Sequence, residues 1–190
     1  YKRQGEIFAL VGENGAGKST LMNILYGIHT PTGGSLTVKG RQITQFHPRA
    51  SIDLGVGMVH QHFMLVRPMT VLQNIILGMK VESYPFIKKK DIAKKIKALS
   101  QKYGLAVDVD KRIDELSVGE QQRVEILKAL YRNAKLLVLD EPTAVLTPQE
   151  TEVLFSVLRS LKEDGHSIIL ISHRLAEIMD CLLYTSDAAD

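Results

Sequence analysis

One glycine-rich segment constrains the possible folds of this chain more than any other feature. Residues 12–19 read Gly-Glu-Asn-Gly-Ala-Gly-Lys-Ser and fit the pattern G-x-x-x-x-G-K-[ST]. The apolar run Ile7–Val11 before them predicts a strand, and Lys18–Tyr26 predicts a helix after them. Glycines let a backbone wrap around a polyphosphate with its N–H groups pointing inward, and the helix adds the positive end of its dipole. The segment therefore predicts a phosphate-binding loop, with Lys18 reaching the β- and γ-phosphates and Ser19 ligating Mg²⁺.

Two acidic residues form a second candidate site. The apolar run Leu136–Leu139 predicts a strand that ends at Asp140 and Glu141. Ligands of doubly wound sheets bind at the carboxyl ends of the strands, so these carboxylates should lie near the phosphate loop. Asp140 is then expected to hold the metal shell, as the acidic residue of P-loop ATPases does. Glu141 could polarise a water molecule against the γ-phosphate.

The rest of the chain alternates short apolar runs with helical patterns, which predicts an α/β fold with a mainly parallel sheet. Residues 70–132 break the alternation with helical patterns and almost no strand signal, so we expect an all-helical insertion there. Ser117 is expected to cap the second long helix of this insertion. Other predicted elements are strands at Leu36–Val38, Val56–Val59 and Ser167–Ile171 and a helix at Pro148–Lys162, capped by Thr147.

Composition excludes several classes of protein. The longest apolar run has five residues, whereas a membrane-spanning helix needs about 20. A single cysteine among the 190 residues cannot form an internal disulfide, which favours a reducing compartment. The net charge is +3, but seven Lys and one Asp between Lys88 and Lys102 supply +6, so the remainder sums to −3. We interpret this lysine cluster as the solvated face of a helix and expect no nucleic acid partner, because aromatic residues are only 6%.

Three further motifs carry a family resemblance. Residues 116–123 read LSVGEQQR and resemble the signature motif of ABC ATPases. Gln61 resembles the Q-loop residue of that family, and His173, after the last predicted strand, resembles its switch histidine. With the phosphate loop and the carboxylates at 140–141, five motifs occur in the family's order. The chain is thus similar to an ABC ATPase over roughly residues 4–180.

Longer stretches resemble a narrower group within that family, the bacterial importers of nucleosides and simple sugars. They are LMNILYG after the phosphate loop, GMVHQHFMLV around Gln61, LSVGEQQRVEILKALYR and DEPTAVLTPQE. Members of this group carry two nucleotide-binding halves in one polypeptide, and the intact phosphate loop is typical of the first half. The resemblance implies a P-loop NTPase core over residues 1–180, with an inserted helical signature subdomain at about 70–132. It also implies ATP and Mg²⁺ as ligands and ATP hydrolysis as the activity.

The resemblance implies roles for individual residues. Gln61 would contact Mg²⁺ and the attacking water, Asp140 would organise the metal, and Ser19 would ligate it. Glu141 would be the general base, and His173 would contact the γ-phosphate. The residues implied to bind ATP are Gly12, Asn14, Gly15, Gly17, Lys18, Ser19 and Thr20, together with Ser117 and Gly119, which would contact ATP held by the opposite half.

Several positions depart from the family pattern. Val118 and Glu120 replace a Gly and a Gln of the common LSGGQ signature, which bears on the strength of the contact with ATP. Gly119 remains, so close approach of the backbone is still expected. Thr147 stands where many members carry an acidic residue, and we assign it no chemical role. The family stacks adenine on an aromatic residue well upstream of the phosphate loop, and Tyr1, only 11 residues before Gly12, is too close to be its counterpart. We therefore expect that residue to be missing and the chain to be truncated at both ends.

The implied partners are a second nucleotide-binding half, a transmembrane permease and, indirectly, a substrate-binding lipoprotein. The permease would contact the Gln61 loop and the helical insertion, placing the chain peripherally at the cytoplasmic face of the bacterial cell membrane. The alternative is a soluble ABC ATPase that acts in translation or on DNA. DNA-repair relatives need long insertions, and only 55 residues separate Gln61 from Ser117. A P-loop kinase is a third class, against which the signature motif argues.

The remaining features are interpreted as structural. His60 and His62 could share one face of a strand, but two ligands are too few for a metal site. Four methionines are expected to fill the core: Met58, Met64, Met69 and Met79. Residues 181–190 read CLLYTSDAAD, which matches the translation of DNA resembling the end sequence and adapter used in transposase-based library preparation. We therefore expect 181–190 to be a non-native tail.

Overall fold

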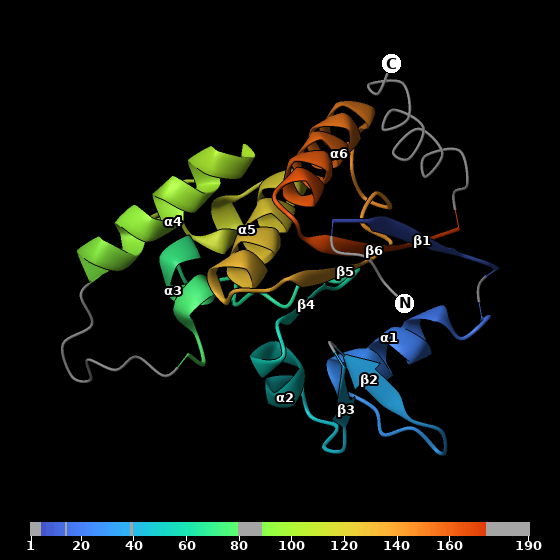
Figure 1. Cartoon of the computed structure of the whole chain (residues 1–190). Coiled ribbons are helices and arrows are strands. Elements are labelled where there is room, and N and C mark those ends of the chain that lie inside the picture. The colour runs from blue at the N-terminus through green and yellow to red at the C-terminus, as the bar shows by residue number, and fades with distance from the viewer. Residues whose placement is uncertain (1–4, 14, 39, 80–88, 174–190) are drawn as a thin grey trace.

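A four-stranded parallel sheet forms the centre of the molecule in the computed structural model (Figure 1). The structure describes residues 5–13, 15–38, 40–79 and 89–173. The strand order is β1-β6-β5-β4, and each neighbouring pair is parallel. The strands are β1 (Ile7–Val11), β4 (Val56–Val59), β5 (Leu136–Asp140) and β6 (Ser167–Ser172). Because the strands are parallel, the carboxyl ends of β1, β5 and β6 lie along one edge.

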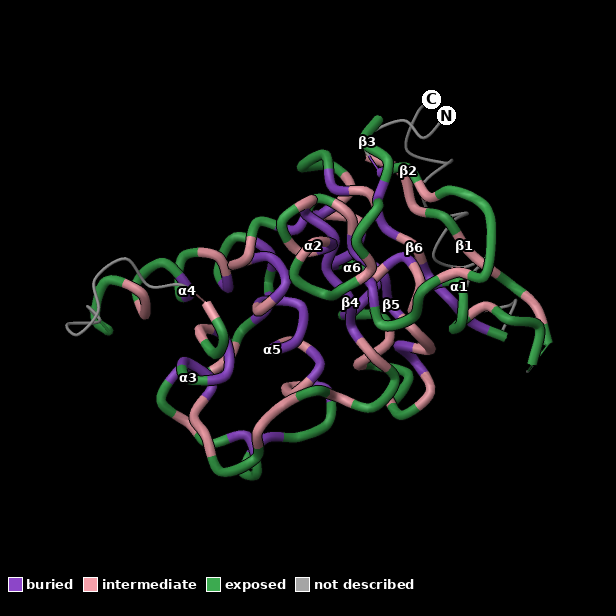
Figure 2. The backbone as a smooth tube through the Cα atoms, turned by 90° about the horizontal axis from the view of Figure 1, so that it is seen from below, coloured by how far each residue is buried: buried purple, intermediate pink, exposed green. Residues whose placement is uncertain are grey.

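Helices and a small hairpin cover the two faces of this sheet (Figure 1). One face carries α3 (Val71–Ile76), α4 (Lys89–Tyr103), the short 3₁₀ helix η1 (Ile113–Glu115), α5 (Val118–Tyr131) and α6 (Pro148–Glu163). The other face carries α1 (Lys18–Tyr26), α2 (Pro48–Asp53) and a two-stranded antiparallel sheet of β2 (Leu36–Val38) and β3 (Arg41–Ile43). Figure 2 shows the buried residues gathered in the strands and along α5.

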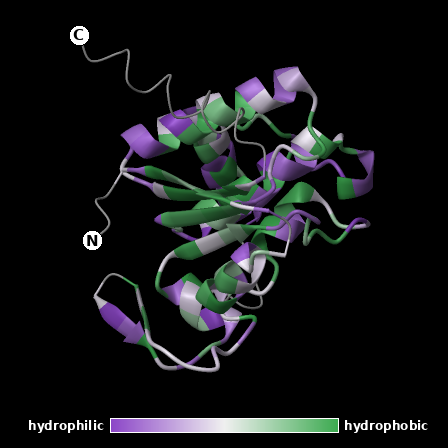
Figure 3. Cartoon of the chain, turned by 90° about the vertical axis from the view of Figure 1, so that its right-hand side faces the viewer, coloured by the Kyte–Doolittle hydropathy of each residue, from purple (hydrophilic) through white to green (hydrophobic). Residues whose placement is uncertain are grey.

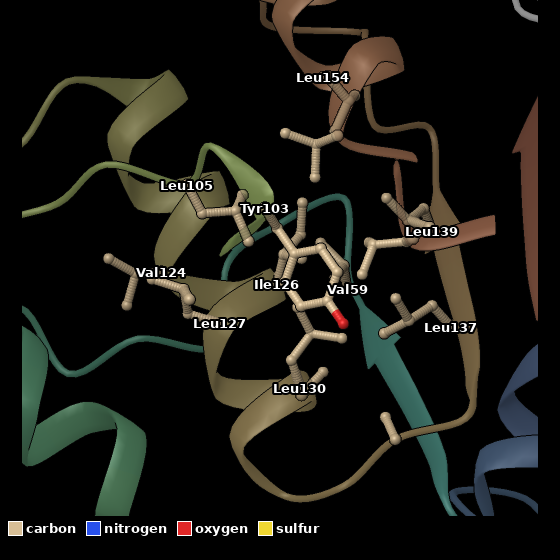
Figure 4. Packing of buried hydrophobic residues seen from close by; sticks show 14 of the residues in the cluster. Val59, Tyr103, Leu105, Val124, Ile126, Leu127, Leu130, Leu137, Leu139 and Leu154 are labelled. Carbon is tan, nitrogen blue, oxygen red and sulfur yellow. The ribbon is translucent and has the colours of Figure 1, made fainter. Parts of the chain in front are cut away.

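Alternating side chains of the central strands serve two separate cores. Leu137 and Leu139 of β5 pack into the larger core with α4, α5 and α6, whereas Val138 packs into the smaller core with α1. Such strands have two apolar faces, which explains their continuous apolar runs. Figure 3 shows this concentration of hydrophobic residues in the sheet, and Figure 4 shows Leu137 and Leu139 facing Ile126 and Leu130 of α5.

Local capping fixes where three helices begin. Thr70, Ser117 and Thr147 each accept a hydrogen bond from the backbone N–H three residues later. In each case a Gln or Glu at that later position reaches back to the capping residue's own N–H. Such capping boxes satisfy N–H groups that have no partner within the helix. The caps predicted at Ser117 and Thr147 are confirmed.

The predicted α/β class with a mainly parallel sheet is confirmed, and four details differ from expectation. Leu36–Val38 is a strand, but it belongs to the small antiparallel sheet. The elements β3 and α2 had no prediction, because β3 begins with Arg41 and Gln42 and so shows no apolar run, and the six residues of α2 are too few to show a helical period. Met58 is buried as predicted, whereas Met64 is 63% exposed, so its prediction as a core residue is wrong.

Asn14 and the segment 181–190 lie outside the described residues, so their predictions stand untested. The part of 70–132 that the structure describes contains α3, α4, η1 and α5, and its β structure there is one isolated bridge between Thr70 and Arg112. Within the described part of the chain, no helix is both long and apolar enough to cross a bilayer.

Candidate functional site

The loop between β1 and α1 leaves open space beside two of its glycines. Gly15 and Gly17 have φ angles of 85° and 83°, in the left-handed region that glycine adopts without strain. Among the described residues, no heavy atom beyond the chain neighbours lies within 4 Å of the Cβ position at either glycine. Lys18 Nζ donates to the carbonyl oxygens of Gly12 at 2.6 Å and Glu13 at 2.7 Å. The first turn of α1 carries no acidic side chain, so its N–H groups and dipole favour an anion.

Polar side chains from β5 and β6 meet this loop at the edge of the sheet. Ser19 Oγ lies 3.4 Å from Asp140 Oδ1. The next residue, Glu141, is one of two described non-glycine residues with a positive φ, at 48°. Its Oε1 lies 2.9 Å from His173 Nδ1, while its Oε2 is buried and has no hydrogen-bond partner among the described residues. An unpartnered buried carboxylate oxygen is suited to accept a proton from a small polar ligand such as water.

These groups line one open cleft of about 400 Å³. Its lining includes Gly15, Gly17, Lys18, Ser19, Thr20, Gln61, Glu141 and His173. The phosphate loop supplies N–H groups and an ammonium, whereas the facing residues supply a carboxylate, an imidazole and an amide. Such a cleft can bind a polyphosphate on one side and orient a water molecule on the other.

Most of the predicted site residues therefore lie together. Asp140 adjoins the cleft because its Oδ1 lies 3.4 Å from Ser19 Oγ, and Ser19 lines the cleft. The carbonyl oxygen of Gly12 accepts a hydrogen bond from Lys18. Ser117 and Gly119 do not line this cleft. They lie at the start of α5, and their contact with ATP on a second half stays a prediction.

The start of α5 explains one departure from the family pattern. Glu120 Oε2 accepts from the Ser117 N–H at 2.8 Å, and Ser117 Oγ accepts from the Glu120 N–H at 3.2 Å. Glu120 is therefore half of a capping box, a role for which either Glu or Gln is suited. Thr147 has the matching structural role at α6, where its side chain accepts from the Glu150 N–H. Val118 stays 41% exposed beside them.

Two polar residues on α5 are buried, although the sequence analysis assigned them no role. Gln122 and Glu125 are each 2% exposed. A sequence signal did exist for Gln122, because it continues the helical spacing of Gly119 and Ile126 on the face that packs into the core. Its amide donates to the Pro142 carbonyl oxygen at 2.9 Å, so it contacts the turn immediately after Glu141.

A second cavity, of about 210 Å³, lies between α5 and the face that carries α1 and α2. Glu125 and Lys128 line it and form an ion pair at 3.2 Å, and Lys128 Nζ also donates to the Met64 carbonyl oxygen at 3.0 Å. His60 borders the cavity and packs edge-on against Tyr26. Burial lowers the pKa of His60, while the nearby Glu125 carboxylate opposes that shift.

No cluster of metal-ligating side chains occurs among the residues that the structure describes. His60 makes an edge-on ring contact with Tyr26, and the interpretation of His60 and His62 as structural stays a prediction.

Comparison with known proteins now identifies the family. A family model described as "ABC transporter" matches residues 2–144, most of the chain. The chain belongs to the ABC transporter family. Among its curated relatives, a nucleoside import ATP-binding protein, NupA of Lactococcus lactis subsp. cremoris, is 54% identical over 93% of this chain and 35% of its own length. The guanosine import ATP-binding protein NupO of Bacillus subtilis is 49% identical over 88% of this chain and 33% of its own length.

Solved structures of ATP-binding cassettes share the same fold. The ADP conformation of MJ1267 has a TM-score of 0.80 and 27% identity, covering 94% of this chain and 74% of that one. A dimeric post-hydrolysis state of MJ0796 with ADP and Pi has a TM-score of 0.77 and 25% identity, covering 92% and 78%. The family and fold expected from the motifs are thus confirmed. This member of the ABC transporter family spans about a third of the length of the curated relatives named above.

Proposed function

We propose that this chain is a nucleotide-binding half of the motor of an ABC importer, which binds and hydrolyses ATP. The single observation that carries the proposal is the cleft in which the phosphate loop faces Gln61, Glu141 and His173. These residues come from four separate segments of the chain. Their meeting in one open cleft supplies both parts that hydrolysis needs, an anion site and a group that can activate water.

The phosphate loop is the proposed binding site for the ATP phosphates. Gly15 and Gly17 leave room for them, and Lys18 would exchange its two carbonyl partners for phosphate oxygens. Ser19, Gln61 and Asp140 are the proposed holders of Mg²⁺, because they offer the oxygen atoms that Mg²⁺ prefers. When bound, Mg²⁺ supplies positive charge that offsets the charge of the phosphates.

Glu141 is the proposed general base. Its unpartnered Oε2 is free to accept a proton from water, while Oε1 is held by His173. Water attacks the γ-phosphorus, the bond to the β-phosphate oxygen breaks, and the water proton passes to Glu141. Ordinary carboxylates are weak bases, so the rate depends on holding Glu141 close to the water.

The proposed partners follow from the parts of the chain that lie outside the cleft. Ser117 and Gly119 are proposed to contact ATP bound to a second nucleotide-binding half. The Gln61 segment and α5 are proposed to receive a transmembrane permease, and the second cavity with exposed Met64 at its edge offers apolar surface there. This arrangement would place the chain at the cytoplasmic face of the membrane, with a substrate-binding lipoprotein as an indirect partner and no nucleic acid.

The proposed cargo is a nucleoside or a simple sugar. Relatives named for import of nucleosides, guanosine, ribose, glucose and arabinose match between 88% and 96% of this chain. A motor of this kind does not contact the cargo, so the chain's own residues do not select among these compounds.

Glu141→Gln tests the proposal in the complete ATP-binding protein assembled with its permease. ATP binding should persist while turnover falls by about 10²–10⁴-fold, because a positioned base is lost. Glu152→Gln is the matched control, since Glu152 is exposed on α6 away from the cleft. Turnover near the wild-type rate in Glu141→Gln would remove Glu141 from its role, and ATP hydrolysis that is indifferent to the permease would contradict the motor function.

A further inference from the structure

Gln122 is a buried polar residue outside the phosphate cleft. A carbonyl oxygen can only accept, so the Gln122 amide nitrogen faces Pro142 O, 2.9 Å away. Burying an amide costs free energy unless it is hydrogen-bonded, and this bond compensates that cost. Proline has no N–H, so the carbonyl is the only backbone group of Pro142 that can form a hydrogen bond. The bond therefore fastens the turn after β5 to helix α5.

The turn that Gln122 holds is strained at Glu141. A φ of 48° is unfavourable for a residue with a side chain, and such a conformation persists only where its surroundings hold it. On one side, the Glu141 N–H donates to the Ile171 carbonyl oxygen of β6 at 2.9 Å. On the other side, Gln122 holds the carbonyl of the following residue. The backbone on both sides of Glu141 is thus tied to a neighbouring element.

We infer that Gln122 is a positioning residue that holds Glu141 in the orientation needed to accept a proton from water. The inference rests on the proposed function, in which Glu141 is the base. The same helix begins directly after Ser117, so α5 carries at its start the residues proposed to contact ATP on the second half. A shift of α5 is therefore transmitted to the Glu141 turn through the side chain of Gln122.

Two variants of the complete ATP-binding protein with its permease test this inference. Gln122→Met keeps the length of the side chain and removes the donor. Gln122→Glu keeps its shape and donates only when the carboxyl is protonated. Displacing a reactive group by about 1 Å can cost about 10²-fold, so kcat should fall by up to that factor with KM for ATP unchanged. For Gln122→Glu, the ratio of its kcat to the wild-type kcat should rise as pH falls.

Combination with Glu141→Gln separates positioning from a general structural role. If Gln122 acts through Glu141, Gln122→Met should cause almost no further loss in the Glu141→Gln background. Asn74→Leu is the control, because Asn74 is also a buried amide, 1% exposed, and its donated bonds go to Val66, Met69 and Thr70. Its effect should add to that of Glu141→Gln, since its partners lie outside the Glu141 turn.

The possible results distinguish the inference from the proposed function. Normal kcat in both Gln122 variants, or losses that add fully to that of Glu141→Gln, would overturn the positioning role. A rise in KM together with a loss of thermal stability, at unchanged kcat, would also overturn the positioning role. Normal turnover in Glu141→Gln alone would instead refute the proposed function on which the inference rests.

Discussion

Gly119 lies directly against Glu150, which joins the start of α5 to the start of α6. A Cβ added at Gly119 would lie 2.4 Å from Glu150 Oε1 and 2.9 Å from its Cδ. Hydrogen bonds from the backbone N–H of Thr147 and, more weakly, of Gly119 lower the pKa of the Glu150 carboxyl. The absence of a side chain at position 119 therefore matters within this chain, whatever Gly119 also contacts in a partner.

Gly119→Ala should displace the Glu150 side chain and break its capping hydrogen bonds. The Thr147 N–H would then lose its bond to the Glu150 carboxylate. A hydrogen bond contributes about 0.5–1.5 kcal/mol, and we expect a fall of up to that size in the free energy of unfolding. Gly33→Ala is the matched control, because its added Cβ meets open space and its backbone is not left-handed. Urea unfolding followed by circular dichroism measures both. Equal stability of the two variants would show that Gly119 and Glu150 do not meet.

Lys18→Met should weaken ATP binding without unfolding the chain. A hydrogen bond to a charged group contributes about 1.5–3 kcal/mol, so the Kd for ATP should rise by at least about tenfold. Lys97→Met is the control, because Lys97 is exposed on α4. Isothermal titration calorimetry with ATP gives the comparison. An unchanged Kd in Lys18→Met would mean that Lys18 keeps its contacts with Gly12 and Glu13 when ATP binds.

Lys128→Met should be much less stable than the double variant Glu125→Met/Lys128→Met. The Glu125 side chain is 3% exposed, so removing Lys128 leaves a buried carboxylate without its cation. Breaking a buried pair costs about 3–5 kcal/mol, whereas replacing both partners by apolar side chains is often neutral or stabilising. Urea unfolding at pH 7 measures both variants. A double variant as unstable as Lys128→Met would show that the bond to the Met64 carbonyl is the important contact.

Asp164 should make the free energy of unfolding fall at acidic pH. Hydrogen bonds from Lys102 and then Tyr103 lower the pKa of the Asp164 carboxyl to about 2. Because this pKa is below that of the unfolded chain, about 4, the contribution is present above pH 4 and is lost as the pH falls towards 2. The stability difference between wild type and Asp164→Asn should therefore shrink over that interval. A difference that stays constant with pH would contradict this assignment.

Local patterns predicted much of the fold. The strands of the parallel sheet were found from short apolar runs, and the starts of α5 and α6 from Ser117 and Thr147. These signals depend on residues within three or four positions of one another, so they can be recognised without knowing how the rest of the chain folds. Several site residues were also predicted to lie together, because they follow parallel strands whose carboxyl ends share an edge.

The sequence by itself determined the phosphate loop, the family and the alternation of strands with helices. Only the tertiary structure decided the strand order β1-β6-β5-β4, the strained φ of Glu141 and the bond from Gln122 to Pro142. Strand order and such bonds join residues 20 or more positions apart, and they depend on how whole elements pack. The local spacing of apolar residues predicts a helix or a strand but does not depend on how distant elements pack. These relationships could therefore be determined only from the tertiary structure.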